Sequence, residues 1–389
     1  MDYYDDFNRL SAPAAIRRSH WDARSGVMFK ASVIRYDAHA YRNSVWQSHD
    51  LRAEKDTRQG FYTFIIIERG KRRVIHSLHY AERVIRRSVC TNALVPILSS
   101  NLIYDNGASL KGKGVSHAAN RCETHLHRFY RETGGNDGYV IVIDFKGYFD
   151  HIQHGPLFDI LDRYLLDPRL NRLAKGFVTA TDADKPDDEK GVGLYIGPED
   201  SQIFAVAYPN SIDHKIKDQW RIKPYNRYMD DSYIIVKDKE TAQAILAALL
   251  VEYDRLGIIP NRKKTQIVKL SKGFSFLKTR YFLTTSGKVI RKADHKAIVR
   301  ERRKLKKQHH LYMEGVMTLE QVVQSYMSWR GSMLQRDAYR SVLSMDQLFF
   351  DLFGETPWKK KKKSKWRKNH EYYPRFYSGR NYCPENAVG

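Results

Sequence analysis

Two adjacent aspartates, Asp230 and Asp231, are the residues of this chain most suited to binding a cation. They end the Tyr-Met-Asp-Asp sequence at residues 228–231, and residues 232–236 after them are aromatic and β-branched. Such a run favours a β-strand, so we predict that the four residues form the tip of a β-hairpin. Because Asp is an ordinary turn residue, a solvated turn would also explain the pair if it stood alone.

A third carboxylate stands upstream at the end of another predicted strand. Residues 138–143 form a short apolar run of the kind found in buried strands, and the run ends directly in Asp144. Three carboxylates on neighbouring strands would give the oxygen ligands that Mg²⁺ prefers. Two such ions, about 3.5–4 Å apart, stabilise the attacking and the leaving oxygen in phosphoryl displacement. We therefore predict nucleotidyl transfer with two Mg²⁺ ions, or with Mn²⁺ in their place.

Basic residues in two further segments are suited to binding phosphate. Residues 71–73 (Lys-Arg-Arg) follow a predicted strand at 61–68 and a turn at Gly70. Arg can bind phosphate with two parallel hydrogen bonds, and Lys supplies a compact charge. Lys111 and Lys113 alternate with glycines and suit a phosphate or a template backbone. In a chain with 67 Lys and Arg, solvated basic turns would explain both segments equally well.

The composition agrees with nucleic acid as the partner. The formal net charge is +23, which attracts phosphate without regard to sequence, although a ribosomal or membrane-surface protein would carry a similar charge. No apolar run approaches the roughly 18 residues of a membrane span, and the acidic start does not resemble a signal peptide. The three cysteines are too few and too scattered for a disulfide framework or a zinc site. We expect a cytoplasmic protein with no membrane partner.

The order and spacing of these segments resemble those of the reverse transcriptase family. Residues 144–150, 193–202 and 228–231 resemble its motifs A, B and C. The resemblance extends from about residue 58 to 353, and its further blocks are the basic strand 71–75, the fingers motif 111–117, motif D at 256–265 and the primer grip at 274–278. It implies an α+β right-hand polymerase fold, with fingers, a palm built on an antiparallel RRM-like sheet, and an α-helical thumb. The implied partners are an RNA template, dNTPs and the DNA product.

The resemblance also implies roles for individual residues. The metal ligands would be Asp144, Asp230 and Asp231, joined by the backbone carbonyl of Phe145. Phe149 would be the steric gate, an aromatic ring that excludes a ribose 2′-hydroxyl, whereas Tyr148 is expected to pack in the core. The residues expected to bind the dNTP are Lys71, Arg72, Arg73, Phe149, Ile196, Gly197, Tyr228, Met229 and Lys264. Those expected to bind nucleic acid are Lys111, Lys113, Ser201, Gln202, Lys278, Arg302, Arg303 and Lys306.

Motif B departs from the retroviral and intron-encoded pattern, which usually has Gln before the glycine. This chain has Ile196 before Gly197, followed by Ser201 and Gln202. That arrangement resembles the enzymes of diversity-generating retroelements and some bacterial reverse transcriptases of antiphage defence. It implies a bacterial or phage enzyme that works with a non-coding RNA, either in defence or in error-prone diversification of a gene. Priming by RNA, DNA or a protein hydroxyl remains open, as does an accessory protein or a homo-oligomer.

Two other classes of function share some of these features. A catalytically silent RNA-binding scaffold would keep the basic segments, but it should lose metal ligands, and all three aspartates are present. An RNA-dependent RNA polymerase would share the carboxylates, but Phe149 argues against it.

Changes in composition and periodicity along the chain suggest five regions. Residues 1–57 lack strong periodicity and are expected to form an N-terminal extension that grips RNA or a partner. Helices are expected at residues 79–98 and 241–256, and the stretch after Lys288 is expected to be helical and basic, with a helix at 295–313 and Thr318 as the N-cap of the next. The expected regions are the extension at 1–57, fingers at 58–137, palm at 138–287, thumb at 288–354 and an RNA-contacting basic and aromatic tail at 355–389.

Overall fold

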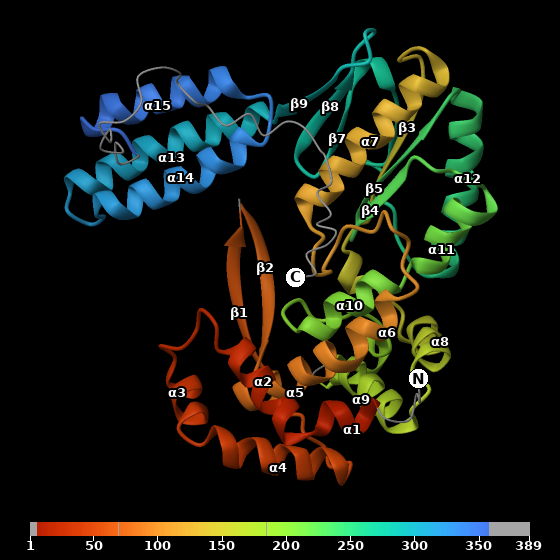
Figure 1. The fold of residues 1–389 in the computed structure, drawn as a ribbon, viewed down its shortest axis with the longest axis vertical. Helices are drawn as coiled ribbons and strands as arrows, with labels where there is room; N and C mark the ends of the chain where they lie inside the picture. Colours follow the sequence, from red (N-terminus) through yellow and green to blue (C-terminus); the bar gives the residue numbers. More distant parts are fainter. Residues whose placement is uncertain (1–5, 69, 184, 358–389) are drawn as a thin grey trace, which may run out of the picture. The chain divides into compact units, whose positions relative to one another are not determined.

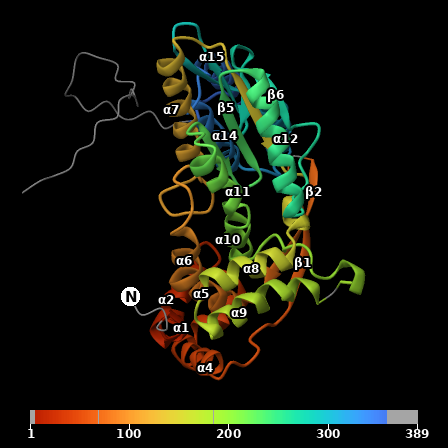
Figure 2. The same cartoon turned by 90° about the vertical axis from the view of Figure 1, so that its right-hand side faces the viewer.

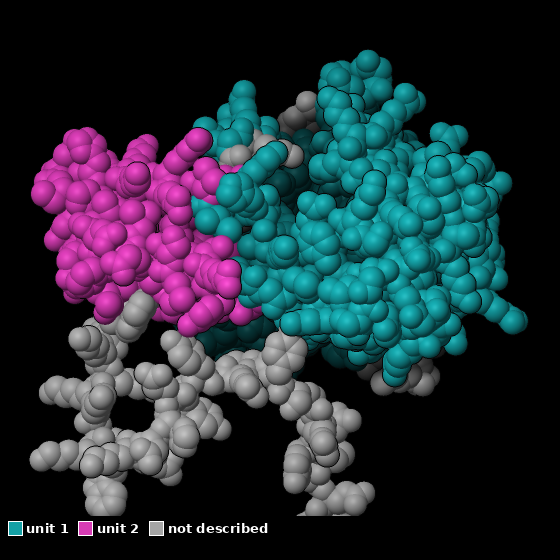
Figure 3. Space-filling view, turned by 90° about the horizontal axis from the view of Figure 1, so that it is seen from above, with its two compact units in different colours: residues 1–298, 336–338 teal, residues 299–335, 339–389 magenta. Residues whose placement is uncertain are grey.

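A computed structural model describes residues 6–68, 70–183 and 185–357. The chain divides into two compact units, shown in different colours in Figure 3. Unit 1 comprises residues 1–298 and 336–338, and unit 2 comprises residues 299–335 and 339–389. The predicted tail lies outside the described residues from residue 358 onward.

Unit 1 contains three antiparallel sheets (Figure 1), which together with its helices confirm the predicted α+β class. A two-stranded sheet pairs β1 (Phe61–Glu68) with β2 (Lys71–Leu78). The four-stranded central sheet has the order β4-β5-β3-β6, and its strands are β3 (Tyr139–Asp144), β4 (Tyr225–Tyr228), β5 (Asp231–Val236) and β6 (Gln266–Lys269). The third sheet consists of β7 (Phe274–Phe276), β8 (Thr279–Leu283) and β9 (Val289–Ala293).

The central sheet is buried on both faces. On β3, Ile141 and Ile143 pack into one hydrophobic cluster, whereas Val140 and Val142 pack into another. This alternation follows from the two-residue period of a strand. Helix α12 (Lys239–Arg255) covers the first face and α7 (Val115–Thr133) the second, as Figures 1 and 2 show. Such a sheet provides rigid positions for the residues at the ends of its strands.

Residues 6–57 contain four helices that sequence periodicity did not reveal. They are α1 (Asp6–Ser11), α2 (Pro13–Ala23), α3 (Ala31–Asp37) and α4 (Ala40–Arg52). Short helices depend on tertiary packing more than on their own propensity. Phe7, Leu10 and Ile16 are buried in the same cluster as Val84 and Val89 of the following helix. The segment therefore shares the core of unit 1.

The remaining helices of unit 1 support the sheets. The predicted helix at 79–98 is present as α5 (Tyr80–Val89), a π-helical segment (Cys90–Leu94) and α6 (Val95–Ser99). The helix predicted at 241–256 is α12. The others are α8 (His154–Tyr164), α9 (Pro168–Thr179), α10 (Glu199–Ala207), α11 (Asn210–His214), a π-helical segment (Lys215–Gln219) and short 3₁₀ segments at Tyr148–His151, Ala180–Asp182, Asp187–Glu189 and Leu270–Lys272.

Unit 2 is helical, as expected. Most of α13 (His295–Met313), α14 (Leu319–Leu334) and α15 (Tyr339–Phe353) lie in it, and Tyr326 and Phe349 are buried at its centre. The predicted N-cap is confirmed, because Thr318 and Gln321 form a reciprocal capping box. No helix among residues 6–68, 70–183 and 185–357 is long and apolar enough to cross a membrane.

The expectation that the chain becomes helical directly after Lys288 was wrong. Residues 289–293 form strand β9, which pairs with β8 and aligns Val289 with Leu283. The β-branched pair Val289 and Ile290 favours a strand. The segment was predicted to be helical because it is rich in basic residues, like the helix that follows it.

Candidate active site

The Tyr-Met-Asp-Asp sequence forms the tip of a hairpin, as predicted. Strand β4 pairs with β5, and Tyr228 lies opposite Asp231 so that Met229 and Asp230 form the turn. Met229 has φ of 55°, a left-handed conformation that costs energy for a residue with a side chain. The surrounding structure must therefore hold this turn in place.

A buried ion pair between Arg227 and Asp213 helps to hold the turn in place. The guanidinium of Arg227 donates to both carboxylate oxygens of Asp213, at 2.5–3.0 Å, and both side chains are about 1% exposed. The same guanidinium donates to the carbonyl of Val206 in α10 at 2.8 Å and to that of Met229 at 3.4 Å. Arg227 thus connects the turn to α10, the helix that begins within motif B.

The third aspartate meets the tip directly. Asp144 at the end of β3 is paired with Asp231 at the start of β5. The backbone amide of Phe145 donates to the carbonyl of Asp230 at 3.1 Å. The register therefore brings together the three strand positions that the sequence predicted to carry metal ligands.

Two segments from later in the chain bind the carboxylates. Asp144 accepts hydrogen bonds from Lys264 Nζ at 2.6 Å and from Asn261 Nδ2 at 3.0 Å. Asp231 accepts one from the backbone amide of Leu277 at 3.0 Å. Leu277 lies in the tight turn between β7 and β8, so the predicted primer-grip segment contacts the carboxylate cluster.

The electrostatics of the cluster favour a cation. Burial raises the pKa of Asp231 to about 7, and the negative charges of Asp230 and Asp144 add to this effect, against the Leu277 amide. Burial also raises the pKa of Asp230, with the charge of Asp144 in the same direction and those of Lys264 and Arg73 opposing it. Placing three carboxylates here therefore costs energy unless positive charge is added.

These residues fit a divalent metal ion in the chemistry of their donors. All three offer carboxylate oxygens, and burial, with a smaller contribution from the neighbouring carboxylates, disfavours the charged forms of Asp230 and Asp231, a cost that a bound cation would relieve. The fit is one of donor chemistry alone, because no group of three or more His, Cys, Asp or Glu that could hold a metal ion is found among the residues that the structure describes. The ammonium of Lys264 is the positive group that contacts Asp144.

The β1–β2 hairpin reaches motif B through backbone and ring contacts. The amide of His76 on β2 donates to the carbonyl of Ile196 at 3.0 Å, and the ring of His76 stacks on Tyr195 with centroids 3.6 Å apart. Gly197 has φ of 144°, and a Cβ on it would lie 2.2 Å from the carbonyl oxygen of His76. Only glycine allows the two backbones to approach this closely.

The predicted dNTP-binding arginines lie on opposite faces of β2, because successive residues of a strand alternate. Arg73 is ion-paired with Glu68 at 3.0 Å, and its charge lowers the pKa of Asp230. Arg72 is exposed on the other face. Lys71 begins β2, and its side chain lies outside the described part of the chain.

Phe149 lies in the 3₁₀ turn after Asp144, is half-buried and packs against the hydrophobic core. Its neighbour Tyr148 is buried and donates from its hydroxyl to the carbonyl of Ala205 at 2.6 Å. Tyr148 therefore packs in the core, as expected.

The predicted nucleic-acid-binding residues are distributed over both units. Ser201 is only 2% exposed in α10, so the expectation that it contacts nucleic acid is not supported. Gln202 beside it is exposed and accepts a hydrogen bond from Ser109. The others with exposed side chains are Lys111 and Lys278 in unit 1 and Arg302, Arg303 and Lys306 in unit 2, whereas Lys113 is half-buried.

Sequence reasoning missed three contributors to the site: Arg227, Asn261 and the amide of Leu277. A charged residue inside a predicted strand, directly before the tip, was the available signal for Arg227. Nothing in the sequence distinguished Asn261 within its basic loop or the Leu277 amide within its turn.

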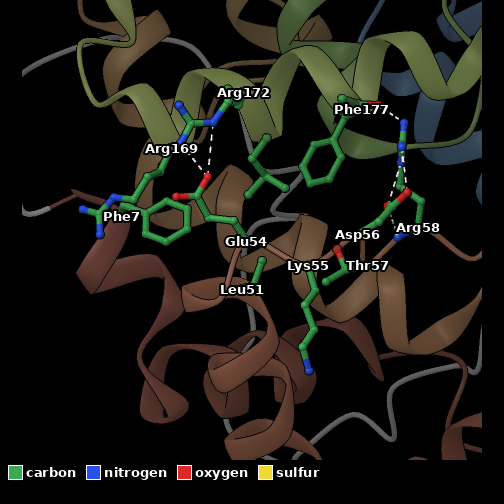
Figure 4. Close-up of a pocket in the computed structure, with 12 residues that line it drawn as sticks. Phe7, Leu51, Glu54, Lys55, Asp56, Thr57, Arg58, Arg169, Arg172 and Phe177 are labelled. Carbon is green, nitrogen blue, oxygen red and sulfur yellow. Dashed lines mark hydrogen bonds and ion pairs between the residues drawn. The ribbon is translucent and has the colours of Figure 1, made fainter.

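A pocket of about 230 Å³ lies away from all of the predicted site residues (Figure 4). It is formed by α1, α9 and the segment after α4. Its arginines are engaged: Arg172 with Glu54 at 2.5 Å, and Arg58 with Asp56 at 2.7 Å. Phe7 and Phe177 line it from opposite sides. The pocket marks the junction between the N-terminal helices and α9.

Comparisons with known proteins give one family and several solved structures. The family model "Reverse transcriptase (RNA-dependent DNA polymerase)" matches residues 68–281, more than half of the chain. No curated protein matches it. Similar solved structures include an apo telomerase from Candida tropicalis truncated from its C-terminal domain, with 14% identity, a TM-score of 0.46, and coverage of 60% of this chain and 55% of that one. Another is telomerase from Candida albicans in complex with a TWJ fragment of telomeric RNA, with 14% identity, a TM-score of 0.47, and coverage of 77% and 58%. This chain spans less than two thirds of the length of those telomerases.

Proposed function

Because the chain belongs to the reverse transcriptase family, we propose that it is an RNA-directed DNA polymerase that transfers nucleotidyl groups from dNTPs to a primer hydroxyl. The observation that carries this proposal is the register of Asp144 opposite Asp231, with Asp230 in the adjacent turn. The hydroxyl oxygen gives its proton to solvent and forms a bond to the α-phosphorus of the dNTP, while the bond from that phosphorus to pyrophosphate breaks and pyrophosphate leaves with the electron pair.

In this proposal, Asp144, Asp230, Asp231 and the carbonyl of Phe145 would hold two Mg²⁺ ions. The ions would supply positive charge at the attacking and leaving oxygens. The rigid sheet keeps the carboxylates in place, and Arg227 holds the strained turn. Lys264 balances part of the negative charge at Asp144.

The nucleotide would be bound between the β1–β2 hairpin and the motif B loop. Arg73, whose charge acts on Asp230, would supply charge for the triphosphate, and Gly197 allows the close approach of the two segments. Ile196, Tyr228 and Met229 would contribute to the walls of the same site. Phe149 would reject ribonucleotides, because a 2′-hydroxyl would collide with its ring.

For the biological role, we propose that the enzyme copies a cognate non-coding RNA in antiphage defence of a bacterial cell. The feature that supports this role is the Ile196-Gly197 pair followed by Ser201 and Gln202, where many relatives have Gln before the glycine. Error-prone copying in a diversity-generating retroelement is the second candidate, since the same feature resembles that group. Sequencing the nucleic acid that co-purifies with the protein would separate the two roles.

Primer extension on an RNA template tests the proposed activity. Wild-type protein is expected to incorporate dNTPs in preference to rNTPs. Phe149→Ala should lose about 10- to 100-fold of that preference, which corresponds to roughly 1.4–2.8 kcal/mol of discrimination. If the wild-type protein shows no preference for dNTPs, the proposal of a reverse transcriptase is wrong.

A further inference from the structure

The loop between α6 and α7, residues 100–114, lies directly beside the candidate active site. Its Asn106 forms a β-bridge to Arg227, and the amide of Gly107 donates to the carbonyl of Arg227 at 3.1 Å. On its other side, Ser109 donates to the side chain of Gln202 at 3.2 Å. A group on this loop is therefore fixed relative to both the catalytic hairpin and motif B.

Tyr104 presents an aromatic ring to solvent from this loop. The residue is 66% exposed, although its neighbours Ile103 and Asp105 are 7% and 5% exposed. Its carbonyl accepts a hydrogen bond from Lys113 Nζ at 2.9 Å. With buried residues on both sides and its backbone bonded, the ring is held outward by a fixed segment of chain.

Two cationic groups lie over the ring. Lys113 Nζ lies 5.3 Å from the ring centroid, and the Arg121 guanidinium carbon lies 5.0 Å from it. The ring of His117 meets it edge-on at 5.5 Å. Other exposed aromatics have less support: Trp21 and Trp46 each lie beside a single arginine.

The charge of this surface is positive. Between residues 99 and 121 the sequence has one acid, Asp105. That carboxylate is buried and paired with Arg121 at 2.5 Å and Lys217 at 2.6 Å. Lys111 is exposed on the adjacent glycine-containing loop. An exposed aromatic ring among cations, with no exposed carboxylate in the same stretch, complements a base and its phosphates.

We propose that Tyr104, Lys113 and Arg121 form a platform on which a base of single-stranded nucleic acid stacks as the strand passes the active site. The platform rests on the proposed polymerase function, because that function brings a single-stranded template to this loop. Tyr104 supplies the stacking face, while Lys113 and Arg121 attract the phosphates. Arg121 also positions the loop through Asp105, so it is unsuited as a test residue.

Fluorescence anisotropy with a labelled 12-nucleotide oligo(U) RNA tests the platform. Tyr104→Ala is expected to weaken binding about 5- to 160-fold, because stacking of one base on an aromatic ring contributes about 1–3 kcal/mol. Tyr104→Phe keeps the ring and should bind within about twofold of wild type. Leu166→Ala is the control, since Leu166 is an exposed apolar side chain (54%) between α8 and α9, outside the residues expected to bind nucleic acid, and it should leave the affinity unchanged. Thermal unfolding of each variant checks that the fold is intact.

Primer extension by wild-type protein, measured in parallel, distinguishes a failure of the platform proposal from a failure of the polymerase proposal. If wild-type protein extends primers and Tyr104→Ala binds RNA as tightly as wild type, the platform is wrong and the polymerase proposal stands. If wild-type protein does not extend primers but Tyr104→Ala still weakens RNA binding, the platform stands without the activity. Loss of a co-purifying protein in Tyr104→Ala, with RNA affinity unchanged, would identify a protein interface and overturn the proposal.

Discussion

The β4–β5 hairpin is buried in a four-stranded sheet, whereas the β1–β2 hairpin forms a sheet of only two strands with most of its side chains exposed. Both carry charged residues that the proposed chemistry needs. On β4, Arg227 is about 1% exposed and bonded to Asp213 and two carbonyls. On β2, Arg73 is 45% exposed and pairs with an equally exposed Glu68.

The difference indicates a division of roles between a fixed and an adaptable part of the site. Carboxylates that bind metal must be held in place before the substrate arrives, and a buried sheet provides this. A two-stranded hairpin is marginally stable on its own, so β1–β2 depends on its contacts with motif B. Such a hairpin is suited to adjust as a nucleotide enters and leaves.

The largest expected effect on stability comes from the buried ion pair. Arg227→Ala leaves Asp213 charged and unpaired in the core, and should lower the free energy of unfolding by about 3–5 kcal/mol. Arg73→Ala removes an exposed pair on the other hairpin and should cost less than about 1 kcal/mol. Urea unfolding of both variants measures the two values. Equal losses would contradict the distinction between a rigid and an adaptable hairpin.

A smaller effect is expected at Asp231, and it depends on pH. The folded-state pKa of about 7 lies above the unfolded value near 3.9, so folding loses stability as pH rises from about 4 to 7. The penalty is complete above pH 7. In EDTA at pH 8, Asp231→Asn should therefore be more stable than wild type. We expect a gain of about 1–2 kcal/mol in the free energy of unfolding, because relaxation of the protein and entry of water reduce the cost of burying the carboxylate.

The measurement for Asp231→Asn is chemical unfolding at several pH values. Below about pH 3 the variant and wild type should unfold alike, because the carboxyl is protonated in both states. A variant less stable than wild type at pH 8 would show that the carboxylate is already neutralised in the folded protein.

The smallest effect is expected at the contact between the exposed hairpin and motif B. His76→Ala removes the ring stacked on Tyr195 but keeps the backbone hydrogen bond to Ile196. An aromatic pair contributes about 0.5–1.5 kcal/mol, so the KM for dNTP should rise about 2- to 12-fold. Steady-state kinetics measure this, and His76→Phe, which retains a ring, should restore most of the loss. An unchanged KM in His76→Ala would show that this contact of the β1–β2 hairpin does not contribute to nucleotide binding.

Much of the active-site sheet could be predicted because local patterns there agree with the fold. The apolar run before Asp144 and the aromatic run after Asp231 predicted β3 and β5, and motif spacing predicted that they meet. The family resemblance is confirmed by the match over residues 68–281. The roles of Asp144, Asp230, Asp231 and Phe149 remain predictions.

The rest depends on contacts between distant parts of the chain. Helices α1 to α4 are stabilised by burial of scattered residues such as Phe7 and Leu10, which show no local period. The ion pair of Arg227 with Asp213 and the hydrogen bond from Leu277 to Asp231 join different parts of the fold. The spacing of these residues along the sequence does not specify that they meet. Strand β9 was missed because its basic residues resemble those of the following helix.

The central claim is that the carboxylates at the ends of β3 and β5 carry out nucleotidyl transfer. Single-turnover incorporation of a dNTP on an RNA template, with Mg²⁺, tests it most directly in wild type and Asp230→Asn. The variant should lose about 1,000-fold or more in the chemical step, while its affinity for the template–primer duplex stays within about twofold. Incorporation at the wild-type rate by Asp230→Asn would contradict the assignment of this hairpin as the catalytic centre.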